Sequence, residues 1–301
     1  MNGVLVIDKP AGLTSHDVVN RVRRILGQRS VGHLGTLDPS ATGILPLVLG
    51  SLTRLARFYI HSEKTYEGAI QFGFATDTYD AEGEPATPKQ EVVLDLAELR
   101  TRASQFVGAI EQMPPPFSAK KIAGVPAYKL ARQKGEVALT PVTVEVKELE
   151  VLDMQGDRAS FRARVSSGTY LRSIAHDLGR QLGCGAHLAS LRRTATAEFT
   201  LDDAHTLEGL AQAAEQGRAE DLLFHPRKLL PEFPAVAVND ETAALIRNGR
   251  AVNLPDLSRS QHVKVFYGQR ELIAIATRVA GTLFRPGIVF ASVIDKTKAH
   301  G

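Results

Sequence analysis

Cysteine and long apolar runs are what this chain has least of. Cys184 is the only cysteine among its 301 residues, which excludes an internal disulfide and a thiolate metal site. No stretch approaches the roughly 20 consecutive apolar residues of a membrane span. The first residues run into charge without the apolar core of a signal peptide. Because the histidines are also scattered, without paired ligand spacings, we expect a cytoplasmic protein with no membrane anchor and no metal site.

What the chain has is a length and composition typical of a globular enzyme, with 44% hydrophobic residues. Its length predicts one large domain and a smaller one. The net charge of +3 is unevenly distributed, with basic segments at 1–60 and 118–134 and an acidic one at 77–111. Folding could gather the positive charge on one face, as a polyphosphate partner requires, although an ordinary solvated surface explains it equally well.

The hydrophobic periodicity predicts strands mixed with helices, without a regular βαβ rhythm. This pattern favours an α+β domain on a largely antiparallel sheet. Strands are expected at 4–7 and 160–165, and helices at 18–26, capped by Ser15 or Asp17, and at 174–182. Prolines at 231 and 234 indicate a linker, and the strand-like runs 263–266 and 272–276 beyond it predict a small all-β module.

The strongest local signal is the segment from Gly32 to Gly43, which is too rich in glycine and proline for a regular element. Asp38 lies inside it, and a carboxylate in such a loop is presented outward on a fixed backbone. Asp38 is therefore a candidate nucleophile or base. An aspartate before proline is also a common turn former, and the loop alone leaves both interpretations open.

The longer segment that contains this loop, Gly32 to Pro46, reads GHLGTLDPSATGILP and resembles the active-site motif of the TruB family of tRNA pseudouridine-55 synthases. Four further segments resemble the same family in the same order: VLVIDKPAGLTSHDVV, KTYEGAIQFGFATDTYDAEG, PPPFSAKKIAGVPAYKLARQKGEV and SSGTYLRSIAHDLGRQLGCGAHLASLRR. The part after Pro234 looks more loosely like the small RNA-binding PUA domain of such enzymes.

The resemblance implies a pseudouridine synthase fold, with a mixed, largely antiparallel sheet flanked by helices. A catalytic domain would span 1–230, with an RNA-gripping insertion at about 112–138, and an all-β PUA-like domain would span 234–301. The implied reaction isomerises uridine to pseudouridine at position 55, in the T-loop of tRNA, through base flipping. The family match implies a monomer that needs neither cofactor nor protein partner and contacts the T-arm stem-loop.

The resemblance also implies roles for individual residues. Asp38 would be the catalytic carboxylate, and Arg172 the cation that keeps it charged. Tyr66 would stack on the target uracil and supply a hydroxyl for proton transfer. Tyr170 and Leu191 would be further pocket residues, and His33 would occupy the space left by flipped bases. Pocket support is expected from Lys9 and Asp80, and RNA-backbone contacts from Lys120, Lys121, Lys129, Arg132 and Lys134.

Three other functions remain open at this stage. The chain could be the catalytic subunit of an RNA-guided enzyme, a tRNA-binding or tRNA-folding module in which Asp38 is idle, or a hydrolase acting on another nucleoside. Within the favoured function, the sequence leaves open whether Asp38 attacks the base or the ribose.

Overall fold

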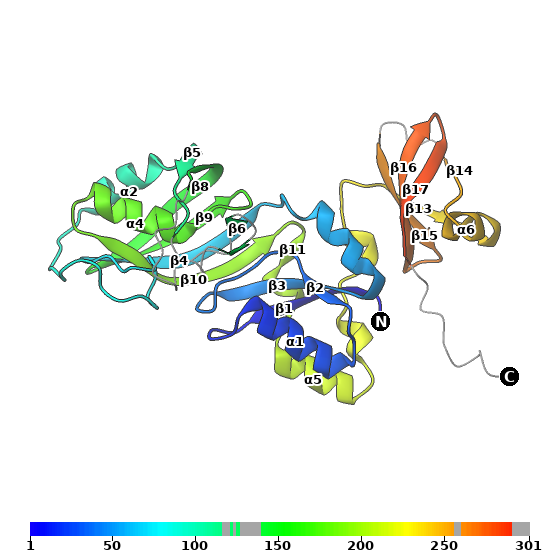
Figure 1. Ribbon diagram of the computed structural model, residues 1–301, viewed down its shortest axis with the longest axis horizontal. Coiled ribbons are helices and arrows are strands. Elements are labelled where there is room, and N and C mark those ends of the chain that lie inside the picture. The colour runs from blue at the N-terminus through cyan, green and yellow to red at the C-terminus, as the bar shows by residue number, and fades with distance from the viewer. Residues whose placement is uncertain (116–120, 123–124, 127–139, 256–259, 291–301) are drawn as a thin grey trace.

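The computed structural model describes residues 1–115, 121–122, 125–126, 140–255 and 260–290. Two sheets organise these residues, a large one in the N-terminal two thirds and a five-stranded one near the C-terminus (Figure 1). Helices pack against both sheets, so the expected α+β class is confirmed.

The large sheet has the order β12-β1-β3-β10-β4-β9-β8-β5, with β2 beside β3 and β11 beside β10. Its strands are β1 (Gly3–Lys9), β2 (Val31–His33), β3 (Thr42–Leu49), β4 (Lys64–Phe72), β5 (Gly108–Gln112), β8 (Val142–Gln155), β9 (Arg158–Val165), β10 (Ala186–Thr196), β11 (Phe199–Thr200) and β12 (Ala204–His205). A separate hairpin pairs β6 (Lys121–Ile122) with β7 (Val125–Pro126).

Most neighbours in the large sheet are antiparallel, as expected, and two pairs are parallel: β1 with β12 and β3 with β10. The second parallel pair sets Thr42 beside Arg192 and Gly43 beside Arg193. It therefore joins the end of the Gly32–Gly43 segment to a strand about 150 residues later in the chain.

The helices packed on this sheet are α1 (Ser15–Leu26), α2 (Leu96–Ser104), α4 (Leu171–Gln181) and α5 (Leu207–Glu215). Short 3-10 helices are η1 (Gly50–Phe58), η2 (Leu201–Asp203), η3 (Ala219–Leu222) and η4 (Pro226–Lys228). In Figure 1, α1 and α5 lie side by side below β1 and β3, and α2 and α4 lie near the other end of the sheet.

The start of α1 differs from the expected cap. Thr14 is the N-cap, and Asp17 closes a capping box with it: the Asp17 amide donates to Thr14 Oγ1, and the Thr14 amide donates back to Asp17 Oδ2. Ser15 is already helical and directs its hydroxyl to Leu37. The sequence pattern placed the helix correctly but could not show which of three neighbouring polar residues has extended backbone angles.

Alternate residues of β1 enter two different cores because side chains on a strand point to opposite faces. Leu5 and Ile7 belong to a core that also holds residues of the four helices named above, while Val4 and Val6 belong to one that holds residues of η1 and Phe224. The second core extends into the C-terminal sheet, where it includes buried Phe266, Leu272, Ile275 and Ile288. Apolar packing thus joins the two sheets directly.

The expected small C-terminal sheet module is present, and its strand order is β13-β15-β16-β17-β14. Its elements are β13 (Ala235–Val238), α6 (Asp240–Arg247), β14 (Val252–Asn253), β15 (His262–Tyr267), β16 (Glu271–Ala280) and β17 (Leu283–Val289). The strand pattern did not predict α6. Asn239 caps that helix by accepting a hydrogen bond from the Thr242 amide, and Ala243 and Ile246 are buried on its inner side. The sequence signals for this helix are therefore one capping residue and a short apolar pattern.

Within the part of the chain that the structure describes, no helix combines the length and the apolar character needed to cross a membrane.

Substitution of Gly43 tests how closely the backbones of β3 and β10 approach each other. Its φ is +96°, and a Cβ there would overlap the backbone of Arg193, whereas Gly168, with φ +89°, has open space around the same position. Gly168→Ala should lower the free energy of unfolding by about 1–3 kcal/mol, the cost of left-handed backbone. Gly43→Ala should lower it clearly further, because the strands must also separate. Urea unfolding measures both, and equal losses would contradict the close approach.

Candidate active site

A cavity of about 870 Å³ lies over the large sheet, between the end of β2, strand β4, the start of α4 and strand β10. Six of the expected site residues line it, although they come from distant parts of the chain: His33, Asp38, Tyr66, Tyr170, Arg172 and Leu191. Lys9 and Asp80 lie outside its wall. Asp80 contacts Arg172, which lines the cavity, and Lys9 donates to the carbonyl of Pro39, the residue after Asp38.

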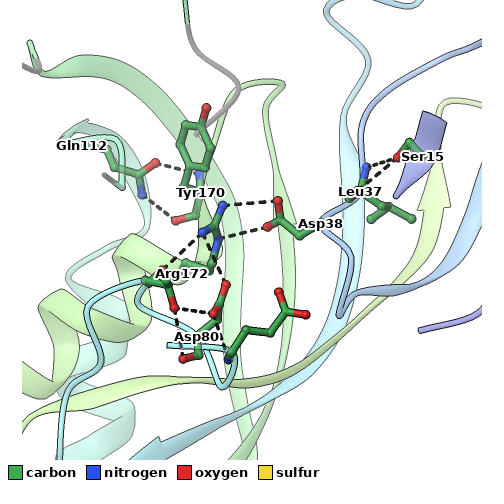
Figure 2. A network of polar contacts seen from close by, with 9 residues as sticks. Ser15, Leu37, Asp38, Asp80, Gln112, Tyr170 and Arg172 are labelled. Atoms are coloured by element: carbon green, nitrogen blue, oxygen red, sulfur yellow. Dashed lines mark hydrogen bonds and ion pairs between the residues drawn. The ribbon is translucent and has the colours of Figure 1, made fainter. Parts of the chain in front are cut away.

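Asp38 and Arg172 form a two-point ion pair at the centre of this group (Figure 2). Arg172 Nε lies 3.0 Å from Asp38 Oδ2, and Arg172 Nη2 donates to Asp38 Oδ1 at 3.3 Å. Behind them, Arg172 Nη1 lies 3.4 Å from Asp80 Oδ2 and donates to the carbonyl of Thr78 at 3.2 Å. The planar guanidinium of Arg172 therefore lies between two carboxylates, with Asp38 on one side and Asp80 on the other.

Burial and charge oppose each other at Asp38. Removal from solvent raises the pKa of its carboxyl above the ordinary value, and the neighbouring Arg172 lowers it, while the negative charge of Asp80 raises it again. The Asp38 side chain keeps 39% of its surface accessible because it faces the cavity. The result is a carboxyl group held against Arg172 and presented to the cavity.

The loop that carries Asp38 is fixed from behind by Lys9 and Ser15. Lys9 is fully buried, and its Nζ donates to the carbonyls of Pro10, Leu13 and Pro39 at 2.7–3.0 Å. Ser15 Oγ accepts from the Leu37 amide at 2.8 Å and lies 3.1 Å from the Leu37 carbonyl. Burial lowers the pKa of Lys9 to about 8. Its contacts are those of a structural support for the residues on either side of Asp38.

Tyr66 is 7% exposed and projects from β4 into the wall of the cavity. Burial raises the pKa of its hydroxyl, and the positive charge of the nearby Arg193 opposes that shift. Arg193 is completely buried and donates to the carbonyls of Ile44, Thr36 and Gly35 at 2.9, 3.4 and 3.1 Å. One guanidinium thus links the loop before Asp38 to the aromatic wall.

The remaining expected residues lie around this centre. His33 accepts the Gly35 amide on Nδ1, at 3.4 Å, and burial lowers the pKa of its ring, so the imidazole is neutral near pH 7. Tyr170 precedes α4, and its backbone is held at both ends by Gln112, whose Oε1 accepts from the Tyr170 amide at 2.7 Å and whose Nε2 donates to its carbonyl at 2.9 Å (Figure 2). Leu191 adds an apolar side to the cavity.

Sequence reasoning missed Gln112, Ser15 as a loop support, and Arg193. Each acts through backbone groups of a remote segment, for which the sequence carries no motif. A weak signal existed for Arg193, which lies two residues after Leu191 on one strand and so shares its face. The expected RNA-backbone residues Lys120, Lys129, Arg132 and Lys134, and the side chain of Lys121, lie outside the described residues.

No group of three or more His, Cys, Asp or Glu side chains that could hold a metal ion occurs in the described ranges.

Comparisons with known proteins give one consistent family. Residues 23–171 match the N-terminal domain of the TruB family pseudouridylate synthases, and residues 172–231 match the tRNA pseudouridylate synthase B C-terminal domain. A tRNA pseudouridine synthase B of Solibacter usitatus is 51% identical over 96% of this chain and all of its own length. Another, of Geobacter sulfurreducens, is 41% identical over 97% of this chain and 92% of its own.

Solved structures share the fold. The chain superimposes with a TM-score of 0.71, at 25% identity, on a chain of an H/ACA RNP bound to a substrate RNA containing 2′-deoxyuridine, over 96% of this chain and 85% of that one. For a chain of a Cbf5-Nop10-Gar1 complex the TM-score is 0.69 at 27% identity, over 93% and 79%. The expected pseudouridine synthase fold is confirmed by these neighbours.

The two neighbours of Asp38 make opposite predictions for its pKa. Arg172→Met removes the cation and should raise it further, whereas Asp80→Asn removes a negative charge and should lower it. A carbon-detected NMR titration of the Asp38 carboxyl measures both shifts, and Glu98→Gln, which removes an exposed carboxylate from α2, controls for net charge. A wild-type pKa near the ordinary aspartate value of about 3.9, unmoved by either variant, would contradict this electrostatic account.

Proposed function

The chain belongs to the TruB family of pseudouridylate synthases, and we propose that it converts uridine to pseudouridine at position 55, in the T-loop of tRNA, with Asp38 as the catalytic carboxylate. The observation that carries this proposal is the pairing of Asp38 with Arg172 at a cavity lined by Tyr66. A paired carboxylate facing a nucleotide-sized space is what the reaction requires.

The reaction is an isomerisation. The bond between N1 of uracil and C1′ of ribose breaks, the uracil turns, and C5 bonds to C1′ with loss of the C5 proton, while N1 gains a proton. No electron is gained or lost overall, so the chemistry requires neither a metal nor an organic cofactor. An ionised Asp38 promotes breaking of the first bond, and the enclosing cavity keeps the detached uracil in place until the second bond forms.

Tyr66 is suited to stacking on the uracil, since it is a fixed aromatic ring in the cavity wall, and its hydroxyl is available for proton transfer. Tyr170 and Leu191 contribute further surface to the same pocket. His33, neutral at the rim, fits the role of filling the space that the flipped uridine leaves in the T-loop. Lys9 and Asp80 would support the site from outside the cavity: Lys9 binds the loop that carries Asp38, and Asp80 pairs with Arg172.

The substrate in this proposal is the T-arm stem-loop, recognised by shape more than by base edges. The H/ACA relative was solved with a substrate RNA, which supports an RNA occupant for a cavity of the same fold. Residues 1–230 would form the catalytic domain and 234–301 a PUA-like RNA-binding domain, with Lys120, Lys121, Lys129, Arg132 and Lys134 gripping the RNA backbone. The protein would act as a monomer in the cytoplasm.

An RNA-guided activity is the second candidate because the structural relatives include a Cbf5-Nop10-Gar1 complex. The relatives with the higher sequence identity carry the name of the tRNA enzyme and match this chain almost end to end. Modification of bare tRNA by the purified chain separates the two functions.

The direct test maps pseudouridine in an unmodified tRNA transcript after incubation with purified protein. Wild type should modify the T-loop uridine, and Asp38→Asn, which keeps the size of the side chain and removes its charge, should lose at least about 10⁴-fold in single-turnover rate. Tight tRNA binding without product from wild type would sink the proposal and favour a binding or RNA-guided function.

Tyr66→Phe separates the ring from the hydroxyl. If the hydroxyl transfers a proton, the single-turnover rate should fall by about 10²–10⁴-fold while tRNA binding persists, because the ring still stacks. Tyr59→Phe is the matched control, since Tyr59 also lines the cavity but donates its hydroxyl to Glu198 at 2.6 Å. Full activity of Tyr66→Phe would rule out the hydroxyl role and leave stacking alone.

A further inference from the structure

Lys64 is a buried cation in the wall of the cavity with unused hydrogen-bonding capacity. It is 9% exposed and lines the cavity two residues before Tyr66. Its Nζ donates to one acceptor, the carbonyl of Ser62 at 2.8 Å, although an ammonium carries three donors. Among the residues that the structure describes, no carboxylate lies within 4 Å of that nitrogen.

A second buried cation lies next to it. Arg193 and Lys64 pack on the same glycine: a Cβ added to Gly35 would lie 3.4 Å from Lys64 Cε and 3.5 Å from Arg193 Nη1. Burial, with a contribution from Arg193, lowers the pKa of Lys64 to about 8. Near pH 7 the site therefore holds two positive charges out of solvent with no acid between them, an arrangement that favours an anion.

The other buried lysines show what a structural lysine looks like in this protein. Lys9 Nζ donates to three carbonyls, and Lys264 Nζ donates to two, those of Arg227 and Leu229. Neither lines the large cavity. Lys64 makes fewer contacts and lies in the cavity wall, so a purely structural role explains it poorly.

The position of Lys64 relative to Tyr66 identifies the anion. Residues two apart on a strand point to the same face and lie about 6.6 Å apart. This spacing is comparable to that between a nucleobase and its own phosphate. With uracil against the Tyr66 ring, the RNA backbone next to it comes within reach of the Lys64 ammonium.

We propose that Lys64, supported by Arg193, binds a backbone phosphate of the target uridine or of the nucleotide next to it, and so positions the uridine over Asp38. The inference rests on the proposed function for its substrate. Lys64 contacts the substrate but no bond that breaks or forms. Its loss should therefore act mainly on binding of the RNA and less on the chemical step.

The test replaces single phosphates of a T-arm stem-loop RNA by neutral methylphosphonates, one linkage at a time, and measures binding. With wild type, neutralising one linkage at or beside the target uridine should weaken binding by between about tenfold and a hundredfold. Lys64→Met should weaken binding to the unmodified RNA by a similar factor and lose its sensitivity to that linkage. The slope of log affinity against log salt should also fall by about 0.7–0.9.

Lys147→Met is the matched control. It removes the same charge from β8, where Lys147 pairs with Glu63 and Glu145 outside the cavity, and should keep the sensitivity of wild type to that linkage. If Lys64→Met remains as sensitive as wild type, or if wild type binds no T-arm RNA, the proposed contact is wrong. Mapping pseudouridine in the same RNA tests the proposed function separately. The binding comparison does not require turnover, so the two proposals can fail independently.

Wild type alone provides a second test in case Lys64→Met fails to fold. Its preference for the charged over the neutral linkage should decline as Lys64 loses its proton above about pH 8. The charged group beside Lys64 is Arg193, and the Glu63 carboxylate instead pairs with Lys147 and Arg164. His33 and Tyr66 line the same cavity, and burial shifts the pKa of each in the direction that favours its neutral form. A preference that is constant up to pH 10 would overturn the assignment.

Discussion

The ion pair between Asp38 and Arg172 is the interaction on which the rest of the site depends. A carboxylate inside a cavity resists ionisation because burial raises its pKa, and a guanidinium 3.0 Å away opposes that effect. Arg172 is itself buried and needs partners of its own, which Asp80 and the Thr78 carbonyl supply. A buried pair of this kind contributes little to stability, but it keeps one group charged and fixed in direction.

The fold brings these partners together through the parallel pairing of β3 with β10. That pairing places Arg193 between the segments on the two sides of Asp38, where it binds the carbonyls of Gly35, Thr36 and Ile44, and its charge also acts on the Tyr66 hydroxyl. Lys9 holds the other side of the loop. The loop that carries Asp38 thus has little regular structure of its own, and its shape is fixed by two fully buried basic side chains bonded to its carbonyl groups and those of adjacent segments.

The sequence predicted the parts of this site that lie in long contiguous motifs. Asp38, Tyr66 and Arg172 were expected from family resemblance, and the structure brings them to one cavity; their catalytic roles stay predictions. The α+β class followed from the mixture of strand and helix patterns, the strand at 160–165 from alternating polarity, and the strand at 263–266 from a short strand-like run; all three are confirmed. Arg193, Gln112 and Ser15 could not be predicted, because each bonds to backbone far away in the chain. The helix α6 was missed because it is short and lies between strands.

The most direct test of this account is chemical rescue of Arg172→Ala by guanidinium, at concentrations too low to unfold the protein. If Arg172 acts by keeping Asp38 charged and oriented, the variant should modify tRNA very slowly, and added guanidinium should restore part of the single-turnover rate in a saturable way. Asp38→Asn should gain nothing under the same conditions. An Arg172→Ala protein that folds, binds tRNA and shows near-normal activity without guanidinium would contradict the central role of the ion pair.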